Sequence, residues 1–200
     1  MRNYPAALFA ASLLLLAGCT FEIPGDSRRF HEDFHYSYTV KPGARLSLEN
    51  FNGAVEITAS SDNRVDVSGT KYAATENLLK SLRVDVNASE DAVRVTTIRP
   101  SGYDFGGFSV RYTLRVPRQM RLDRVQTTNG SLEADGLELP ATLRTTNGAI
   151  TVRDFGSSVD AQTTNGSIRA TGVKGSITVR TTNGAIRAED VAGGFDGSTT

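Results

Sequence analysis

The sequence Thr127-Thr128-Asn129-Gly130 recurs unchanged from Thr145, from Thr163 and from Thr181, so the spacing between successive copies is constant. A fixed period of this size is typical of chains built by stacking one small structural unit on itself. Each unit of such a stack contacts only its neighbours, and the stack presents an extended surface. The repeat therefore indicates a surface-presenting architecture rather than a single catalytic pocket.

Apolar and polar residues alternate inside each 18-residue unit. Strand side chains point alternately to two faces, so the apolar positions 6, 8, 11, 15 and 17 and the first Thr are predicted to lie inside. The second Thr is predicted to point outward. Each unit then has two short strands, with Asn-Gly at one turn and a Gly- or Asp-containing corner at the other. Gly, and Asn less readily, accept the positive φ that such turns often need. The predicted Asn-Gly turn residues are Asn129, Gly130, Asn147, Gly148, Asn165, Gly166, Asn183 and Gly184.

The predicted fold is an all-β, single-domain β-solenoid that resembles a parallel β-helix and has one coil per repeat unit. Stacking in register would place Thr on Thr and Asn on Asn about 4.8 Å apart, so every copy would meet the same neighbours. An antiparallel β meander is the alternative, because Asn-Gly between alternating strands is also a hairpin signal. A meander gives no reason for units of constant length, so the solenoid is favoured.

The folded domain is predicted to span residues 36–200, with irregular coils over 36–126 and regular repeats over 127–200. Residues 52–55, Asn-Gly-Ala-Val, resemble the later Asn-Gly-Ala-Ile, so the coils are expected to start near residue 45. One short helix is predicted over residues 75–82, where Thr75 is a suitable N-cap and three leucines share one helical face. No Pro-rich or charged linker divides this part of the chain.

Residues 1–18 are predicted to be a signal peptide, with a positive start and a short apolar stretch. This stretch ends in Leu16-Ala17-Gly18-Cys19, which resembles the lipobox of bacterial lipoproteins. The resemblance implies cleavage before Cys19, acylation of its thiol and a lipid anchor in the membrane, followed by a tether over residues 19–35. By resemblance to enterobacterial sorting, Thr20 after the cysteine implies the outer membrane, facing the periplasm or the cell surface. Cys19 is the only cysteine, so no intramolecular disulfide is expected.

The segment His31-Glu32-Asp33-Phe34-His35 matches the H-E-x-x-H pattern of zinc proteases. That chemistry needs a helix, on which residues i and i+4 share one face. Residues 34–40 are instead rich in aromatic and β-branched side chains and precede Pro42-Gly43, which predicts a strand. On a strand the two histidines would lie about 13 Å apart. We therefore predict no metal site and no cofactor.

Several segments together resemble the bacterial β-strand-repeat family of unknown function whose members carry the label "putative adhesin". They are Val40–Gly43 before Leu46–Leu48, Asn52–Val55, Tyr112–Pro117 and the Thr-Thr-Asn-Gly array. The resemblance covers residues 36–200. It implies a β-solenoid in an envelope-associated protein, with no established catalytic residues.

The expected function is non-catalytic: a lipid-anchored envelope protein whose repetitive surface serves binding, adhesion or scaffolding, with an envelope protein or a glycan as partner. The formal net charge is zero, which does not favour nucleic acid. The alternative is a polysaccharide-active lyase or hydrolase, but the acidic residues scatter over outward positions rather than converging. The candidate binding residues, all outward by alternation, are Arg144, Thr146, Thr164, Arg180 and Thr182.

The same spacing counted onward from Thr181 reaches Thr199-Thr200, which resembles the start of another unit. Solenoid ends need caps, because an open coil exposes unpaired strand edges. We therefore expect either self-association or another partner at the C-terminal coil, or a chain that is short relative to its relatives.

Overall fold

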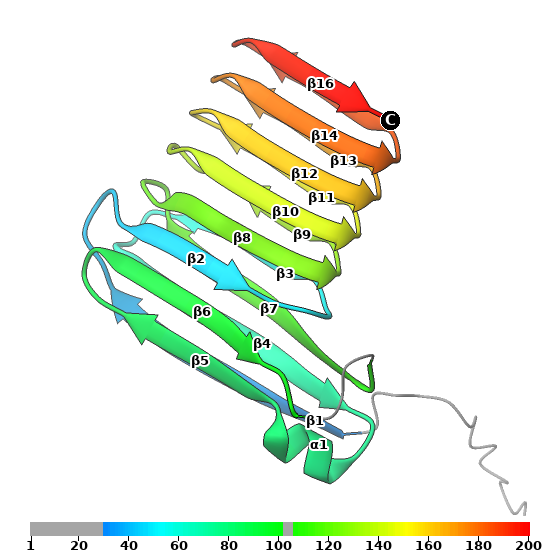
Figure 1. Ribbon diagram of the computed structural model, residues 1–200. Helices are drawn as coiled ribbons and strands as arrows, with labels where there is room; N and C mark the ends of the chain where they lie inside the picture. Colours follow the sequence, from blue (N-terminus) through cyan, green and yellow to red (C-terminus); the bar gives the residue numbers. More distant parts are fainter. Residues whose placement is uncertain (1–29, 102–105) are drawn as a thin grey trace, which may run out of the picture.

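A computed structural model describes residues 30–101 and 106–200 (Figure 1). The described part contains one short helix, α1 (Glu76–Ser81), and otherwise only strands, turns and loops. No helix in it is both long and apolar enough to cross a membrane. The strands are β1 (Phe30–Thr39), β2 (Arg45–Glu49), β3 (Val55–Ser60), β4 (Arg64–Ala73), β5 (Arg83–Ala88), β6 (Ala92–Ile98), β7 (Phe108–Pro117), β8 (Arg121–Asn129), β9 (Leu132–Asp135), β10 (Ala141–Asn147), β11 (Ile150–Phe155), β12 (Val159–Asn165), β13 (Ile168–Val173), β14 (Ile177–Asn183), β15 (Ile186–Val191) and β16 (Phe195–Thr199).

The strands form two sheets of eight strands each, and the chain winds between them (Figure 1). Sheet A has the order β1-β4-β7-β3-β9-β11-β13-β15, and sheet B has the order β16-β14-β12-β10-β8-β2-β6-β5. From β8 onward the strands alternate between the two sheets, so each coil contributes one strand to each. Both inner faces meet in a single hydrophobic core.

The strands of the repeat pair in parallel and in register. Thr145 on β10 pairs with Thr163 on β12, which in turn pairs with Thr181 on β14. On sheet A, β11, β13 and β15 pair in the same way. The predicted β-solenoid is thus confirmed, and the antiparallel meander is wrong for this region.

The interior follows the alternation predicted from the sequence. The first Thr of each repeat is buried, and its neighbours along the core are apolar. Burial weakens in the last coil, where Ile186 and Val191 are only partly buried and Phe195 is 54% exposed. The buried repeat residues are Thr127, Leu132, Ala134, Leu137, Ala141, Leu143, Thr145, Ile150, Val152, Phe155, Val159, Ala161, Thr163, Ile168, Ala170, Val173, Ile177, Val179 and Thr181.

The order of coils in space differs from their order in the chain. The coil β2–β3 lies between β6–β7 on one side and β8–β9 on the other. After β3 the chain builds β4, α1 and β5, and only then returns through β6 and β7 to pair in parallel with β2 and β3. The periodicity of the sequence indicates which segments are strands, but it does not specify which later strand pairs with a given strand in the sheet.

Antiparallel strands and α1 form the N-terminal end of the stack. In sheet A, β4 pairs antiparallel with β7 and β1 pairs antiparallel with β4; in sheet B, β5 pairs antiparallel with β6. The helix is in the predicted place: the Leu78 N–H donates to the Thr75 hydroxyl at 3.2 Å, and Leu78 and Leu79 are buried.

Strand β1 begins at Phe30, so residues 30–35 belong to the fold and not to the tether predicted over 19–35. Phe34 explains this difference. Its ring lies against Gly69 of β4 and meets the Tyr112 ring edge-on, with centroids 5.6 Å apart. An aromatic side chain packed in this way favours the ordered strand over a free tether.

Candidate functional site

The glycine of the repeat motif is required by close stacking. A β-carbon at Gly148 would overlap the carbonyl oxygen of Gly130, and Gly166 stands in the same relation to Gly148. The positive φ expected at these turns is absent: neither glycine has one. Positive φ occurs instead at the opposite corner, for example at Gly172 (70°) and at Asp154 (52°).

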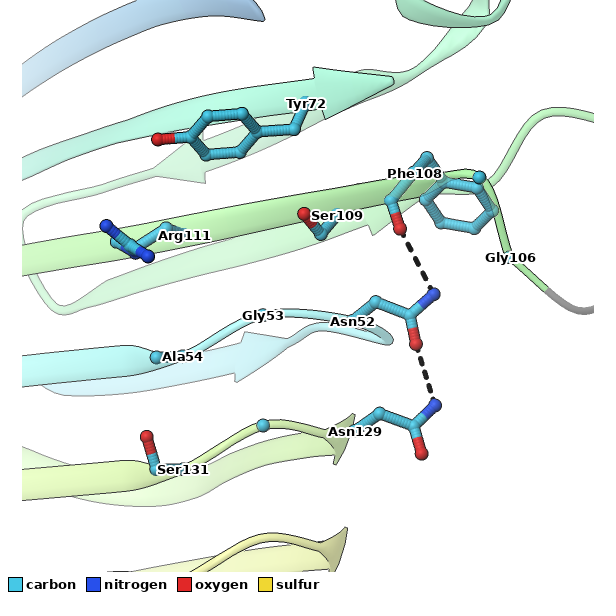
Figure 2. Close-up of a pocket in the computed structure, with 12 residues that line it drawn as sticks. Asn52, Gly53, Ala54, Tyr72, Gly106, Phe108, Ser109, Arg111, Asn129 and Ser131 are labelled. Carbon is cyan, nitrogen blue, oxygen red and sulfur yellow. Dashed lines mark hydrogen bonds between the residues drawn. The ribbon is translucent and has the colours of Figure 1, made fainter. Parts of the chain in front are cut away.

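The asparagines form a ladder of side-chain amides along one edge of the stack. Asn129 donates to Asn52 at 2.7 Å, and Asn52 donates to the Phe108 carbonyl at 3.3 Å (Figure 2). The ladder then continues coil by coil to Asn183, with steps of 2.7 to 2.8 Å. The predicted turn residues therefore also tie neighbouring coils together.

The two threonines of the motif have different environments. The first is buried and donates its hydroxyl to a glycine carbonyl, as Thr163 does to Gly148 at 2.9 Å. The second is exposed in all four copies, and its hydroxyl makes no hydrogen bond to any residue that the structure describes. The first Thr, the Asn and the Gly thus all take part in coil stacking, whereas the second Thr is exposed to solvent.

The predicted binding residues lie together on the outer face of sheet B. Arg144 on β10 is in register with Gln162 on β12, and Gln162 with Arg180 on β14. The two arginines are thus two strands apart, about 10 Å. Arg144 faces Asp160 at 3.7 Å and Arg180 faces Asp196 at 3.4 Å. The three exposed threonines Thr146, Thr164 and Thr182 follow them on the same strands.

Three adjoining depressions continue this face along β2. Their volumes are about 440, 320 and 180 Å³, and each shares lining residues with the next. Ser47 lines the first two depressions and Glu49 the last two, so we call the three together the β2 trough. The last depression includes Arg144 and Thr146, which joins the trough to the predicted binding face.

A β-bulge in β8 forms one wall of the trough. The pairing of β8 shifts register both against β2, between Leu46 and Ser47, and against β10. As a result Asp123 and Arg124 are both exposed in succession. Bulges are common beside functional sites because they redirect a side chain. Alternation alone does not locate this bulge, so the trough could not be predicted from the sequence pattern.

A depression of about 480 Å³ lies at the outer face of sheet A, beside the Asn ladder (Figure 2). Gly53 and Ala54 line it with little or no side chain, and the larger side chains of Tyr72, Ser109 and Arg111 also border it (Figure 2). Its lining is mostly hydroxyl, amide and guanidinium groups. These groups could hydrogen-bond a polar ligand.

A buried polar network behind the trough joins β6, β7 and the loop that follows β2. The Thr97 hydroxyl donates to the Asn50 side chain at 2.9 Å and lies 2.7 Å from the Tyr112 hydroxyl. Asn50 also donates to the Val110 carbonyl at 2.9 Å. Burial raises the pKa of Tyr112, although its hydrogen bond with Thr97 acts in the opposite direction. This network is saturated and holds the coil β2–β3 against its neighbour.

The H-E-x-x-H segment lies on strand β1. His31 pairs with Tyr72 and His35 with Ser68, whose hydroxyl oxygen lies 2.9 Å from the His35 Nδ1. Two histidines four residues apart on a strand are too distant to share one metal ion. Within residues 30–101 and 106–200, no three His, Cys, Asp or Glu side chains gather as a metal site. Cys19, the predicted lipid attachment site, lies outside the described residues.

Neither a protein-family model nor a curated protein matches the sequence. Several solved bacterial structures match this chain at low sequence identity. A "putative cell adhesion protein" from Clostridium sporogenes is 9% identical over 84% of this chain and 100% of its own, with a TM-score of 0.49. A "putative adhesin" from Bacteroides fragilis is 11% identical over 84% of this chain and 97% of its own, with a TM-score of 0.37. Another from Parabacteroides distasonis is 9% identical over the same shares, with a TM-score of 0.27.

Proposed function

We propose that this chain is a lipid-anchored cell-envelope protein whose β-solenoid binds an envelope component without catalysing a reaction. The anchor is Cys19, at the end of the lipobox-like run, and the binding surface is the outer face of sheet B. Anchoring at one end of a rigid stack would hold this face close to the envelope. A binding face held in this position would suit both adhesion and scaffolding.

The observation that carries the proposal is the second Thr of the motif. Stacking accounts for the other three motif residues, whereas the second Thr is identical in four copies although it is exposed and unbonded to any described residue. It lies beside Arg144 and Arg180, so sheet B presents a hydroxyl group about every 5 Å, once per coil, and a guanidinium group on every second coil. Such a periodic polar surface suits a partner that is itself repetitive.

The acidic residues of the regular coils do not favour the alternative of a polysaccharide-active enzyme. Glu133 pairs with Arg153, Asp160 with Arg144 and Glu189 with Arg187. Glycoside hydrolysis uses two carboxyl groups that flank one bond, whereas each of these carboxylates is paired with an arginine. These carboxylates therefore suit a solvated, charge-balanced surface.

The anchor is tested in bacterial cells that express the full chain and are fed a labelled fatty acid. We expect label on the protein and recovery in the membrane fraction. Cys19→Ala should abolish both, because the acylated thiol is the anchor. Label that persists on Cys19→Ala would contradict the assignment.

The binding face is tested by co-sedimentation of the purified lipoprotein with isolated cell envelopes. Arg144→Ala/Arg180→Ala should weaken saturable binding by about tenfold or more, the effect of losing at least one charge-assisted hydrogen bond. Arg153→Ala/Arg187→Ala is the matched control, because these arginines are similarly exposed and ion-paired but lie on sheet A. Equal loss in both variants would mean that the face of sheet B is not the site.

A further inference from the structure

We propose that the β2 trough is a binding site for an extended, carboxylate-bearing polysaccharide, with Arg94 and Arg124 taking the acid group above Ser47. This inference rests on the proposed binding function, because it names the ligand class and a second part of the surface. The trough lies across β6, β2 and β8, beside the regular repeats of sheet B (Figure 1).

Strand pairing sets the two arginines on either side of the serine. Ser47 is in register with Arg94 on β6 and with Arg124 on β8, and both arginines are exposed. Their backbones are thus two strand spacings apart, about 10 Å. Long side chains from both sides can reach a group that rests on the short serine side chain. A planar guanidinium binds a carboxylate in a bidentate manner, and two of them facing each other can grip a single acid group.

The nearby carboxylates contact groups other than the two central arginines. Asp123 lies 2.9 Å from Arg121 and 3.8 Å from Arg45, so it is balanced by arginines other than the central pair. Glu49 accepts a hydrogen bond from Gln126 at 2.8 Å. Among the described residues, neither acid forms an ion pair with the arginines that flank Ser47.

The two central arginines keep their charge available for a ligand. Within the described part of the chain, neither Arg94 nor Arg124 forms an ion pair. Arg124 donates only to the neutral side chain of Gln126, at 2.8 Å. The middle of the trough therefore presents two guanidinium groups that are free of ion pairs with the described residues, although the whole chain has a formal net charge of zero.

The shape of the trough favours a chain-like ligand. It follows β2 from Arg45 to the Asn50-Phe51 loop, and the five residues of β2 span about 16 Å. Its lining also includes hydroxyl and amide groups, such as those of Thr96 and Gln126. An extended glycan has hydroxyl groups along its whole length and would meet hydrogen-bonding partners at each step.

Other macromolecules fit this surface less well. A peptide cannot add to β2 as a new strand, because β6 and β8 already pair with both of its edges. Protein partners usually need a buried aromatic anchor, and the only aromatic ring in the trough, Phe51, is stacked under Arg99 at 4.1 Å. Nucleic acid usually requires a strongly basic domain, whereas the formal net charge of this chain is zero.

The test measures binding of the full, acylated chain in detergent to defined alginate oligosaccharides, which are polyuronates. We expect saturable binding that weakens with added salt, because the contacts are charged. Arg94→Ala/Arg124→Ala should raise the dissociation constant by about tenfold or more, since each arginine supplies a charge-assisted hydrogen bond. Arg94→Lys/Arg124→Lys should recover only part of the affinity, because lysine keeps the charge but not the bidentate geometry.

Ser47→Tyr provides an independent steric test, since it fills the floor without changing charge. It should abolish alginate binding while the thermal midpoint stays within a few degrees of wild type. Arg153→Ala/Arg187→Ala on sheet A is again the control and should bind as wild type. Dextran, polyglutamate and single-stranded DNA separate the ligand classes: neutral sugar, acidic peptide and polyphosphate.

Each outcome decides the proposal. Alginate binding that is lost in the Arg94/Arg124 and Ser47 variants supports it. Equal binding of polyglutamate or DNA would overturn it, because the site would then recognise charge without sugar. Envelope binding without alginate binding would overturn the trough assignment alone, whereas the absence of envelope binding would contradict the proposed function itself.

Discussion

At the scale of single residues, stacking distance decides which side chains the repeat accepts. Gly148, Gly166 and Gly184 each lie so close to the preceding coil that a β-carbon would overlap a carbonyl oxygen. The same coils place an asparagine next to each glycine, where its amide can bond to the copies above and below. Small size and amide bonding therefore act together to set the coil spacing.

Gly166→Ala should destabilise the protein by about 1–3 kcal/mol, the usual cost of forcing extra atoms into a packed site. The added methyl group meets backbone of Gly148, which cannot move away as a flexible side chain would. Urea denaturation followed by circular dichroism measures the difference. Gly194→Ala is the matched control, because its β-carbon would find only the Ser176 hydroxyl at 3.6 Å. Similar losses in both variants would contradict the close-stacking explanation.

Tyr112 should make stability fall at alkaline pH. Burial raises its pKa above the ordinary value of about 10, so the folded state keeps the proton that the unfolded state loses. The contribution of protonated Tyr112 to the free energy of unfolding is complete below pH 10. Above pH 10 it is lost by up to about 1.4 kcal/mol per pH unit.

Tyr112→Phe isolates this effect, because other titrating groups are common to both proteins. The variant should cost about 1 kcal/mol at neutral pH through the lost hydrogen bond to Thr97, yet lose less stability than wild type above pH 10. Denaturation curves at several pH values provide the comparison. Parallel decline of the two proteins above pH 10 would argue against a buried, protonated Tyr112.

At the scale of elements, the positions of the regular strands could be predicted from the sequence, but the pairing between strands could be predicted only in part. The repeats fix their own register, because each copy meets an identical copy, and the strands from β10 onward follow the predicted alternation. The place of β2 between β6 and β8 depends on a long-range return of the chain. The central residues of the β2 trough, Arg94, Ser47 and Arg124, come from those three strands. Local periodicity could therefore predict the outward placement of Arg144 and Arg180, but not Arg94 opposite Arg124.

Strand β1 allows a test of why the fold extends to Phe30. Phe34→Ala should destabilise the protein by about 2 kcal/mol, less than for a fully buried Phe, because its ring is only half-buried. It removes the contacts with Gly69 and with the Tyr112 ring. His31→Ala, on the exposed face of the same strand, should change stability by less than about 0.5 kcal/mol. Thermal unfolding of both variants measures this, and an equal effect would mean that β1 is held by pairing alone.

At the scale of the whole molecule, the stack behaves as a line of coils in which each contacts only its neighbours. The N-terminal end is covered by β1, β5 and α1, with Leu78, Leu79 and Leu82 buried there. In the coil of β15 and β16, by contrast, Ile186 is half-buried and Phe195 is 54% exposed. Apolar burial per coil thus decreases toward β16, and local stability should decrease with it.

Native-state hydrogen exchange should therefore show a gradient along the stack. Amides of β15 and β16 should exchange through local opening, at a free energy well below that of global unfolding, because few buried contacts oppose it. Amides of β11 and β12, which have a coil on each side, should approach the global value. Phe195→Ser is the useful comparison: it should leave exchange in β11 and β12 unchanged, because an exposed ring adds little to their stability. Uniform protection from β8 to β16 would mean that the coils open as one cooperative unit, and the nearest-neighbour description of this solenoid would then be wrong.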